Sequence, residues 1–163
     1  MRPNPMHRLL AAVAIAMVAV VGTIAQSTPN LGGTWMLDAA KSDPAPAVPA
    51  GGRGRGNQNQ MVITQAPSEI TVAIGANTYI YNLDGTERTG PPGGETKSRI
   101  AWSGGRLVVT WKREYFAGPD KGYLTSTGQD TYALDGNILT VQRTTEGPSQ
   151  PAQTRKSVYN KAP

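Results

Sequence analysis

Short runs in which apolar and polar residues alternate fill the chain from residue 61 onward. In Ile70-Thr71-Val72-Ala73-Ile74 every second side chain is a branched apolar one, and Arg106 to Arg113 repeats the alternation with Leu107, Val109 and Trp111. Because successive side chains of a strand point to opposite faces of a sheet, this spacing predicts strands with one buried face. No helix of useful length is predicted.

The same alternation predicts eight to nine strands, most of them joined by short connections. They cover 33–37, 61–65, 70–74, 78–83, 98–102, 106–113, 123–134, 138–145 and 154–160, with 86–88 as a short continuation. Turn pairs such as Asp84-Gly85, Gly104-Gly105 and Asp135-Gly136 favour sequential antiparallel hairpins. We therefore predict an all-β fold, an antiparallel up-and-down barrel whose closure removes exposed edges, with a sandwich as the alternative.

The N-terminus has the order of features found in a secretory signal peptide. Two arginines and a histidine precede an unbroken apolar run, Leu9 to Val21, and Thr23-Ile24-Ala25 offers small residues for cleavage. The run is shorter than the ~20 apolar residues that span a bilayer, which makes a retained anchor the weaker alternative. We predict a signal peptide at 1–25, export to the periplasm or the extracellular space, and no stable membrane span after cleavage.

Residues 26–163 are predicted to form a single domain that is poor in aliphatic side chains. They hold 21 Leu, Ile, Val and Phe, together with three Trp and six Tyr, so a core needs the aromatic residues for volume. The stretch 43–60 is rich in proline and glycine, and predicts a long flexible loop. The mild net charge, +3 without the signal, forms no focused basic patch and argues against nucleic acid as a partner.

Missing residue types exclude several classes of site. The chain has no cysteine, and its one histidine, His7, lies in the predicted signal peptide. The exported protein then lacks thiol nucleophiles and imidazole bases, and with them most hydrolase triads and most zinc or copper sites. Glu114 and Glu146 are not placed near each other by the sequence, and no calcium loop is present. We predict a protein that is not an enzyme and that holds no metal or cofactor.

Five aromatic residues fall on the more apolar faces of predicted strands: Tyr79, Tyr81, Trp102, Trp111 and Tyr132. In a barrel open at one end, they are candidates to line a cavity for a flat or apolar ligand. In a small closed barrel they fill the core instead, and the scarcity of aliphatic residues favours this second interpretation.

Gly33-Thr34-Trp35, followed by a long loop and a β-meander, resembles the lipocalin-like barrels. The resemblance implies that Gly33 and Trp35 close the narrow end of the barrel, with Trp35 against a cation near the end of the last strand. Arg155 and Lys156 are the candidates for this cation, and Arg143 is a weaker one. The chain lacks lipocalin disulfides and shows no clear second or third lipocalin motif.

Ala40-Lys41-Ser42 and the Pro/Gly-rich stretch after it make the chain similar to small exported bacterial proteins, most of which have no assigned function. Together with the barrel, this resemblance implies a non-catalytic protein that binds a small apolar molecule or lipid in its interior. The alternative is a structural or interaction module of the cell envelope with a filled core and no ligand. The two hypotheses differ in whether the barrel contains a cavity.

Overall fold

The computed structural model describes residues 28–44, 59–90, 95–148 and 150–163. These ranges contain ten strands and no helix, and hence no helix long and apolar enough to cross a membrane. The predicted signal peptide and most of the predicted loop at 43–60 lie outside them. The strands are β1 Gly33–Leu37, β2 Gln60–Gln65, β3 Glu69–Ile74, β4 Asn77–Asn82, β5 Arg88–Thr89, β6 Glu95–Ser103, β7 Arg106–Phe116, β8 Tyr123–Asp135, β9 Ile138–Gly147 and β10 Gln150–Lys161.

All ten strands belong to one antiparallel sheet. Chain neighbours are mostly sheet neighbours, and β1 pairs with β10, which gives the order β4-β3-β2-β1-β10-β9-β8-β7-β6-β5. The prediction of an antiparallel up-and-down barrel is confirmed. The number of strands exceeds the predicted eight to nine because the short continuation near residue 88 forms β5 and pairs with β6.

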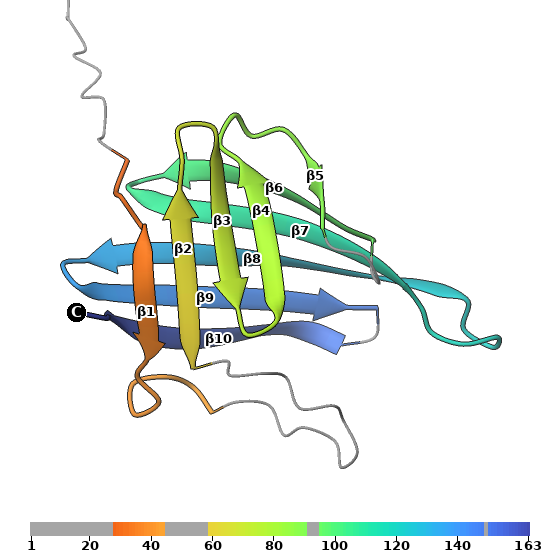
Figure 1. Cartoon of the computed structure of the whole chain (residues 1–163). Coiled ribbons are helices and arrows are strands. Elements are labelled where there is room, and N and C mark those ends of the chain that lie inside the picture. Colours follow the sequence, from red (N-terminus) through yellow and green to blue (C-terminus); the bar gives the residue numbers. More distant parts are fainter. Residues whose placement is uncertain (1–27, 45–58, 91–94, 149) are drawn as a thin grey trace, which may run out of the picture.

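The sheet folds over itself, so that β1 to β4 cross β7 to β10 (Figure 1). Its two ends, β4 on one side and β5 with β6 on the other, lie against each other without backbone pairing. We call this junction the seam. Arg88 of β5 bridges the seam, because its Nη1 donates to Asn82 Oδ1 at 3.0 Å and lies 3.4 Å from Glu69 Oε2. The barrel is therefore nearly closed, because side-chain contacts cross the seam where, among the described residues, no backbone hydrogen bonds join the two ends of the sheet.

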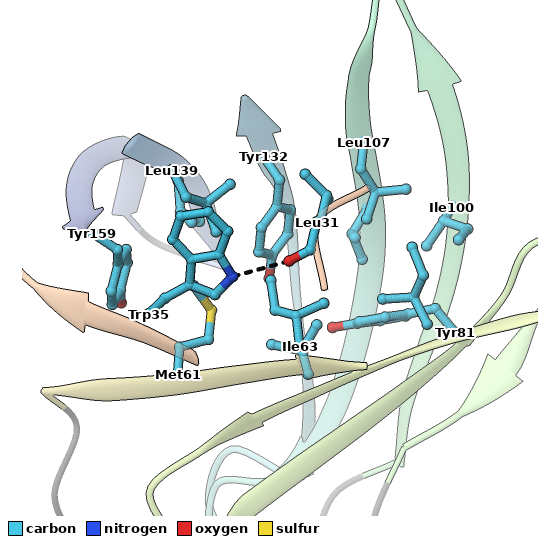
Figure 2. Packing of buried hydrophobic residues seen from close by; sticks show 14 residues of the cluster. Leu31, Trp35, Met61, Ile63, Tyr81, Ile100, Leu107, Tyr132, Leu139 and Tyr159 are labelled. Carbon is cyan, nitrogen blue, oxygen red and sulfur yellow. Dashed lines mark hydrogen bonds between the residues drawn. The ribbon is translucent and has the colours of Figure 1, made fainter. Parts of the chain in front are cut away.

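The core lies between the crossed halves of the sheet (Figure 2). Every second residue of the strands points inward, as the alternation predicts. The buried cluster consists of Leu31, Trp35, Met61, Ile63, Ile70, Val72, Tyr81, Ile100, Leu107, Val109, Tyr132, Leu139, Val141 and Tyr159. Aromatic rings thus supply much of the volume that the few aliphatic side chains cannot.

Trp35 lies in the core, on β1 where this strand pairs with β10. Its side chain is fully buried, and its Nε1 donates to the Leu31 carbonyl oxygen at 2.9 Å (Figure 2). The cation over its ring is Lys161, with Nζ at 5.5 Å from the ring centroid. Gly33 makes room for it: the glycine has φ +142°, and a Cβ there would lie 3.0 Å from Lys161 Cε. The Gly-X-Trp pattern therefore has a steric cause in this barrel.

The expected partners of Trp35, Arg155 and Lys156, are not the cations that cover it. Strand β10 runs on to residue 161, and the register places Trp35 opposite Lys161. Arg155 instead donates to the carbonyl oxygens of Asp43 and Pro44, and the Lys156 amide donates to Asp43 Oδ2 at 2.6 Å. Both residues therefore link strand β10 to the turn that follows β1.

Candidate functional site

The inward-facing side chains of β7 change from apolar to charged along the strand. Leu107 and Val109 are fully buried, Trp111 is half-buried, and Arg113 is exposed. On β8 and β9, the inward positions just beyond the core are Asp130 and Arg143, which lie opposite each other in the ladder. The interior therefore has a filled apolar end around Trp35 and a polar end beyond Val109.

A pocket of about 170 Å³ lies at this polar end. It is lined by Tyr79, Ile80, Tyr81, Gly90, Thr96, Ser98, Trp111, Arg113, Asp130 and Arg143. Its walls come from β4 on one side and from β6 to β9 on the other, so the pocket is located at the seam. We call it the seam pocket.

A buried ion pair forms the floor of the seam pocket. Asp130 is 1% exposed. Arg143 donates two hydrogen bonds to its carboxylate, from Nε to Oδ1 at 2.7 Å and from Nη2 to Oδ2 at 2.5 Å. Trp111 Nε1 lies 3.5 Å from Oδ1, on the same carboxylate. These hydrogen bonds raise the pKa of Arg143 above its already high usual value, so its positive charge is permanent. The side chain of Arg143 is half exposed, which leaves part of the guanidinium facing the pocket.

The indole of Trp111 packs against a glycine of the next strand. The register places Trp111 opposite Gly128, and a Cβ at that glycine would lie 2.3 Å from Trp111 Cζ2 and 2.5 Å from the Thr144 carbonyl oxygen. Only a residue without a side chain leaves space for the ring in this position. Gly128 therefore fixes one aromatic wall of the pocket.

The opposite wall is formed by tyrosines of β4. Tyr79 is half-buried and Tyr81 is 7% exposed, with its ring turned into the core (Figure 2). Burial, reinforced by the negative charge of Asp130, raises the pKa of Tyr81 far above its usual value. Its hydroxyl stays protonated at all physiological pH values. Two tyrosines and one tryptophan thus surround a charged floor.

Arg113 stands at the rim of the seam pocket. It is exposed, and within the described part of the chain it forms no ion pair. The pocket therefore carries two arginines against one aspartate, a net positive charge. Hydroxyl groups of Thr96 and Ser98 add polar contacts nearby.

The five aromatic residues singled out from the sequence divide between the pocket and the core. Tyr79, Tyr81 and Trp111 come together around the seam pocket. Tyr132 is 2% exposed in the centre of the core, and Trp102 packs against the edge of the core, outside the pocket. Three of the five residues thus line a pocket, as the cavity interpretation expects, and the other two belong to the core or pack against it, as the filled-core interpretation expects.

Sequence reasoning missed the charged residues of the site, Asp130, Arg143 and Arg113. The signal was in the alternation itself, because Asp130 shares its face with Tyr132 and Arg143 shares its face with Val141. A charged residue in phase with buried positions on two successive strands indicates a buried pair. The lipocalin resemblance makes Arg143 a weaker candidate for the cation over Trp35, whereas the structure places it on Asp130. Among the described residues, no group of three or more acidic or metal-binding side chains is positioned to hold a metal ion.

Neither a family model nor a curated protein matches this sequence. Among solved structures, the chain is similar to the crystal structure of a secretory abundant heat soluble (SAHS) protein from Ramazzottius varieornatus. The two share 16% sequence identity with a TM-score of 0.52, over 81% of this chain and 95% of that one. At this identity the likeness shows the fold alone. With the strand order and register above, it shows that the chain has the fold of a lipocalin-like β-barrel.

Proposed function

We propose that this protein is a non-enzymatic lipocalin-like barrel that binds a small amphiphilic molecule in the seam pocket. The ligand has an apolar part about the size of one ring and carries a negatively charged group. The observation that carries this proposal is the seam pocket itself, in which aromatic walls meet an excess of arginine side chains.

The volume of the pocket restricts the ligand. A cavity of about 150 Å³ holds one benzene molecule, whereas sites for larger ligands usually measure about 300–1,000 Å³. The seam pocket, at about 170 Å³, is suited to a single ring. The apolar end offers no extension, because Trp35, Leu31 and Met61 are buried there in close contact. A small ring compound therefore fits the site better than a long lipid chain held in the interior.

The net positive charge of the pocket favours a negatively charged group on the ligand. Asp130 neutralises Arg143, and Arg113 remains without an acidic partner among the described residues. A carboxylate or similar anion near the rim can accept hydrogen bonds from Arg113 and from the exposed side of Arg143. A cationic ligand would meet a net repulsion.

Two further observations support an exported location for this activity. The N-terminal residues have the order of a signal peptide. The SAHS protein, with which the chain shares its fold, is described as secretory. We include export in the proposal on these grounds.

The filled core favours a second candidate function, an interaction module of the cell envelope without a ligand. Fourteen buried side chains occupy the interior, and of these only Tyr81 also lines the seam pocket. This candidate is preferred if the seam pocket takes up no small molecule.

Calorimetric titration with benzoate, using benzyl alcohol as the neutral probe with the same ring, tests the proposed ligand chemistry. We expect benzoate to bind more tightly, and Arg113→Gln to weaken benzoate binding about tenfold, because one charge-assisted hydrogen bond is lost. Lys112→Gln is the matched control, since Lys112 is the exposed neighbour on the same strand and contacts Glu114. Equal binding of both probes, or equal effects of the two substitutions, would contradict an anion site.

A further inference from the structure

The β7–β8 hairpin extends beyond the rest of the barrel. The ladder between β8 and β9 begins at Thr127, whereas β8 continues to pair with β7 as far as Tyr123. Figure 1 shows the tip of this hairpin projecting past the neighbouring strands. An isolated two-stranded ribbon is marginally stable in water, so the projection adds little to the stability of the barrel.

The side chains at this tip are apolar on both faces. The register pairs Tyr115 with Leu124 on the inward-facing side and Phe116 with Tyr123 on the outward-facing side. Phe116 is 59% exposed and Tyr123 is 77% exposed, and their rings contact each other with centroids 5.5 Å apart. The other large exposed apolar side chains of the described residues are no more than 43% exposed. We call these four residues the aromatic tip.

We propose that the aromatic tip docks this protein on the surface of an anionic lipid bilayer. Tyrosine suits the interface between water and hydrocarbon, because its ring is apolar and its hydroxyl is hydrated, and phenylalanine adds an apolar ring that hydrocarbon can cover. Lipid also covers a narrow ribbon on both faces at once. A partner protein would meet only four large side chains, far fewer than the twenty to thirty residues that each side of a stable protein interface usually contributes.

The charge of the region favours an anionic surface. Arg113 lies just below the tip and Lys121 lies in its turn, and neither forms an ion pair within the described ranges. Asp120 is the one acidic residue in the turn, and Glu114 is occupied by Lys112 at 3.0 Å. Without the predicted signal peptide, the chain carries a net charge of +3. Attraction of basic residues to an anionic leaflet therefore adds to burial of the two rings. This inference does not depend on the ligand proposed for the seam pocket.

Flotation of the purified protein with phosphatidylcholine vesicles, with and without phosphatidylglycerol, tests the proposal. We expect the protein to float with the anionic vesicles and to bind them at least about tenfold more weakly when Phe116→Ser and Tyr123→Ser are combined, because two buried rings are lost. The matched control combines Met36→Ser and Val62→Ser, which also remove two exposed apolar side chains. It should retain vesicle binding.

Three results would overturn the proposal. The first is a protein that does not float with anionic vesicles, or that binds neutral vesicles equally well. The second is an equal loss of binding in the two double variants. The third is a concentration-dependent dimer that the tip substitutions abolish in the absence of vesicles, which would make a second copy of the chain the occupant of the tip. Unchanged melting temperatures in both double variants confirm that the fold is intact in the comparison.

Discussion

Replacement of Trp35 by alanine is expected to reduce the free energy of unfolding by about 4 kcal/mol. The indole is fully buried in the core of the barrel, and its removal leaves a cavity that the surrounding strands cannot close. The substitution also removes the donor to the Leu31 carbonyl oxygen and the ring beneath Lys161. The total free energy of unfolding of a native protein is about 5–15 kcal/mol, so this one change brings the barrel close to unfolding.

Urea denaturation followed by circular dichroism measures this loss. Trp35→Phe keeps most of the volume and should lose clearly less than Trp35→Ala, and it remains measurable if the alanine variant does not fold. Trp102→Ala is the control, because Trp102 is only partly buried at the edge of the core. If Trp102→Ala destabilises the protein as much as Trp35→Ala, burial of the Trp35 indole is not the cause of the expected loss.

Replacement of Arg143 by glutamine is expected to reduce the free energy of unfolding by about 3 kcal/mol. The reason lies in Asp130, which is 1% exposed and receives two hydrogen bonds from the arginine. Without Arg143, a carboxylate stays buried with only the distant donor of Trp111 beside it. The half-exposed position of Arg143 lets some water reach the site, so the expected loss is at the low end of the range for broken buried pairs.

Two further variants separate this cause from a general loss of a surface charge. Arg88→Gln breaks the partly exposed pair with Glu69, 3.4 Å apart, and should cost less than about 1 kcal/mol. Asp130→Asn combined with Arg143→Gln removes both charges and should recover part of the lost stability. A double variant that is no more stable than Arg143→Gln alone would show that the two residues are not coupled.

The fold follows closely from local patterns. The bounds of β1 are those expected, because a glycine opens it and Trp35 occupies an inward position. β7 continues three residues past its predicted end at Arg113, because hydrogen bonding to β8 extends it where the alternation of apolar residues has already ended. β10 begins at Gln150 rather than at residue 154, and it includes Pro151 near its start. Tertiary pairing therefore sets the strand ends that composition alone does not reveal.

The site depends on distances between strands, which local patterns do not contain. The positions of aromatic residues on the apolar faces of predicted strands make Tyr79, Tyr81 and Trp111 candidates, and these three line the pocket. The pairing of Asp130 with Arg143 follows from the register of β8 on β9 and needs the structure. The same holds for Lys161, which reaches Trp35 through the register of β10 on β1.

The central claim is that a ring-sized anion binds in the seam pocket, and an NMR titration with benzoate tests it most directly. The three tryptophans each contribute one indole N–H signal, and Trp111→Phe identifies the signal from the pocket. We predict that the Trp111 signal shifts progressively and saturates, while those of Trp35 and Trp102, which lie outside the pocket, stay in place. A Trp111 signal that does not move, or shifts confined to Trp35 or Trp102, would contradict the account.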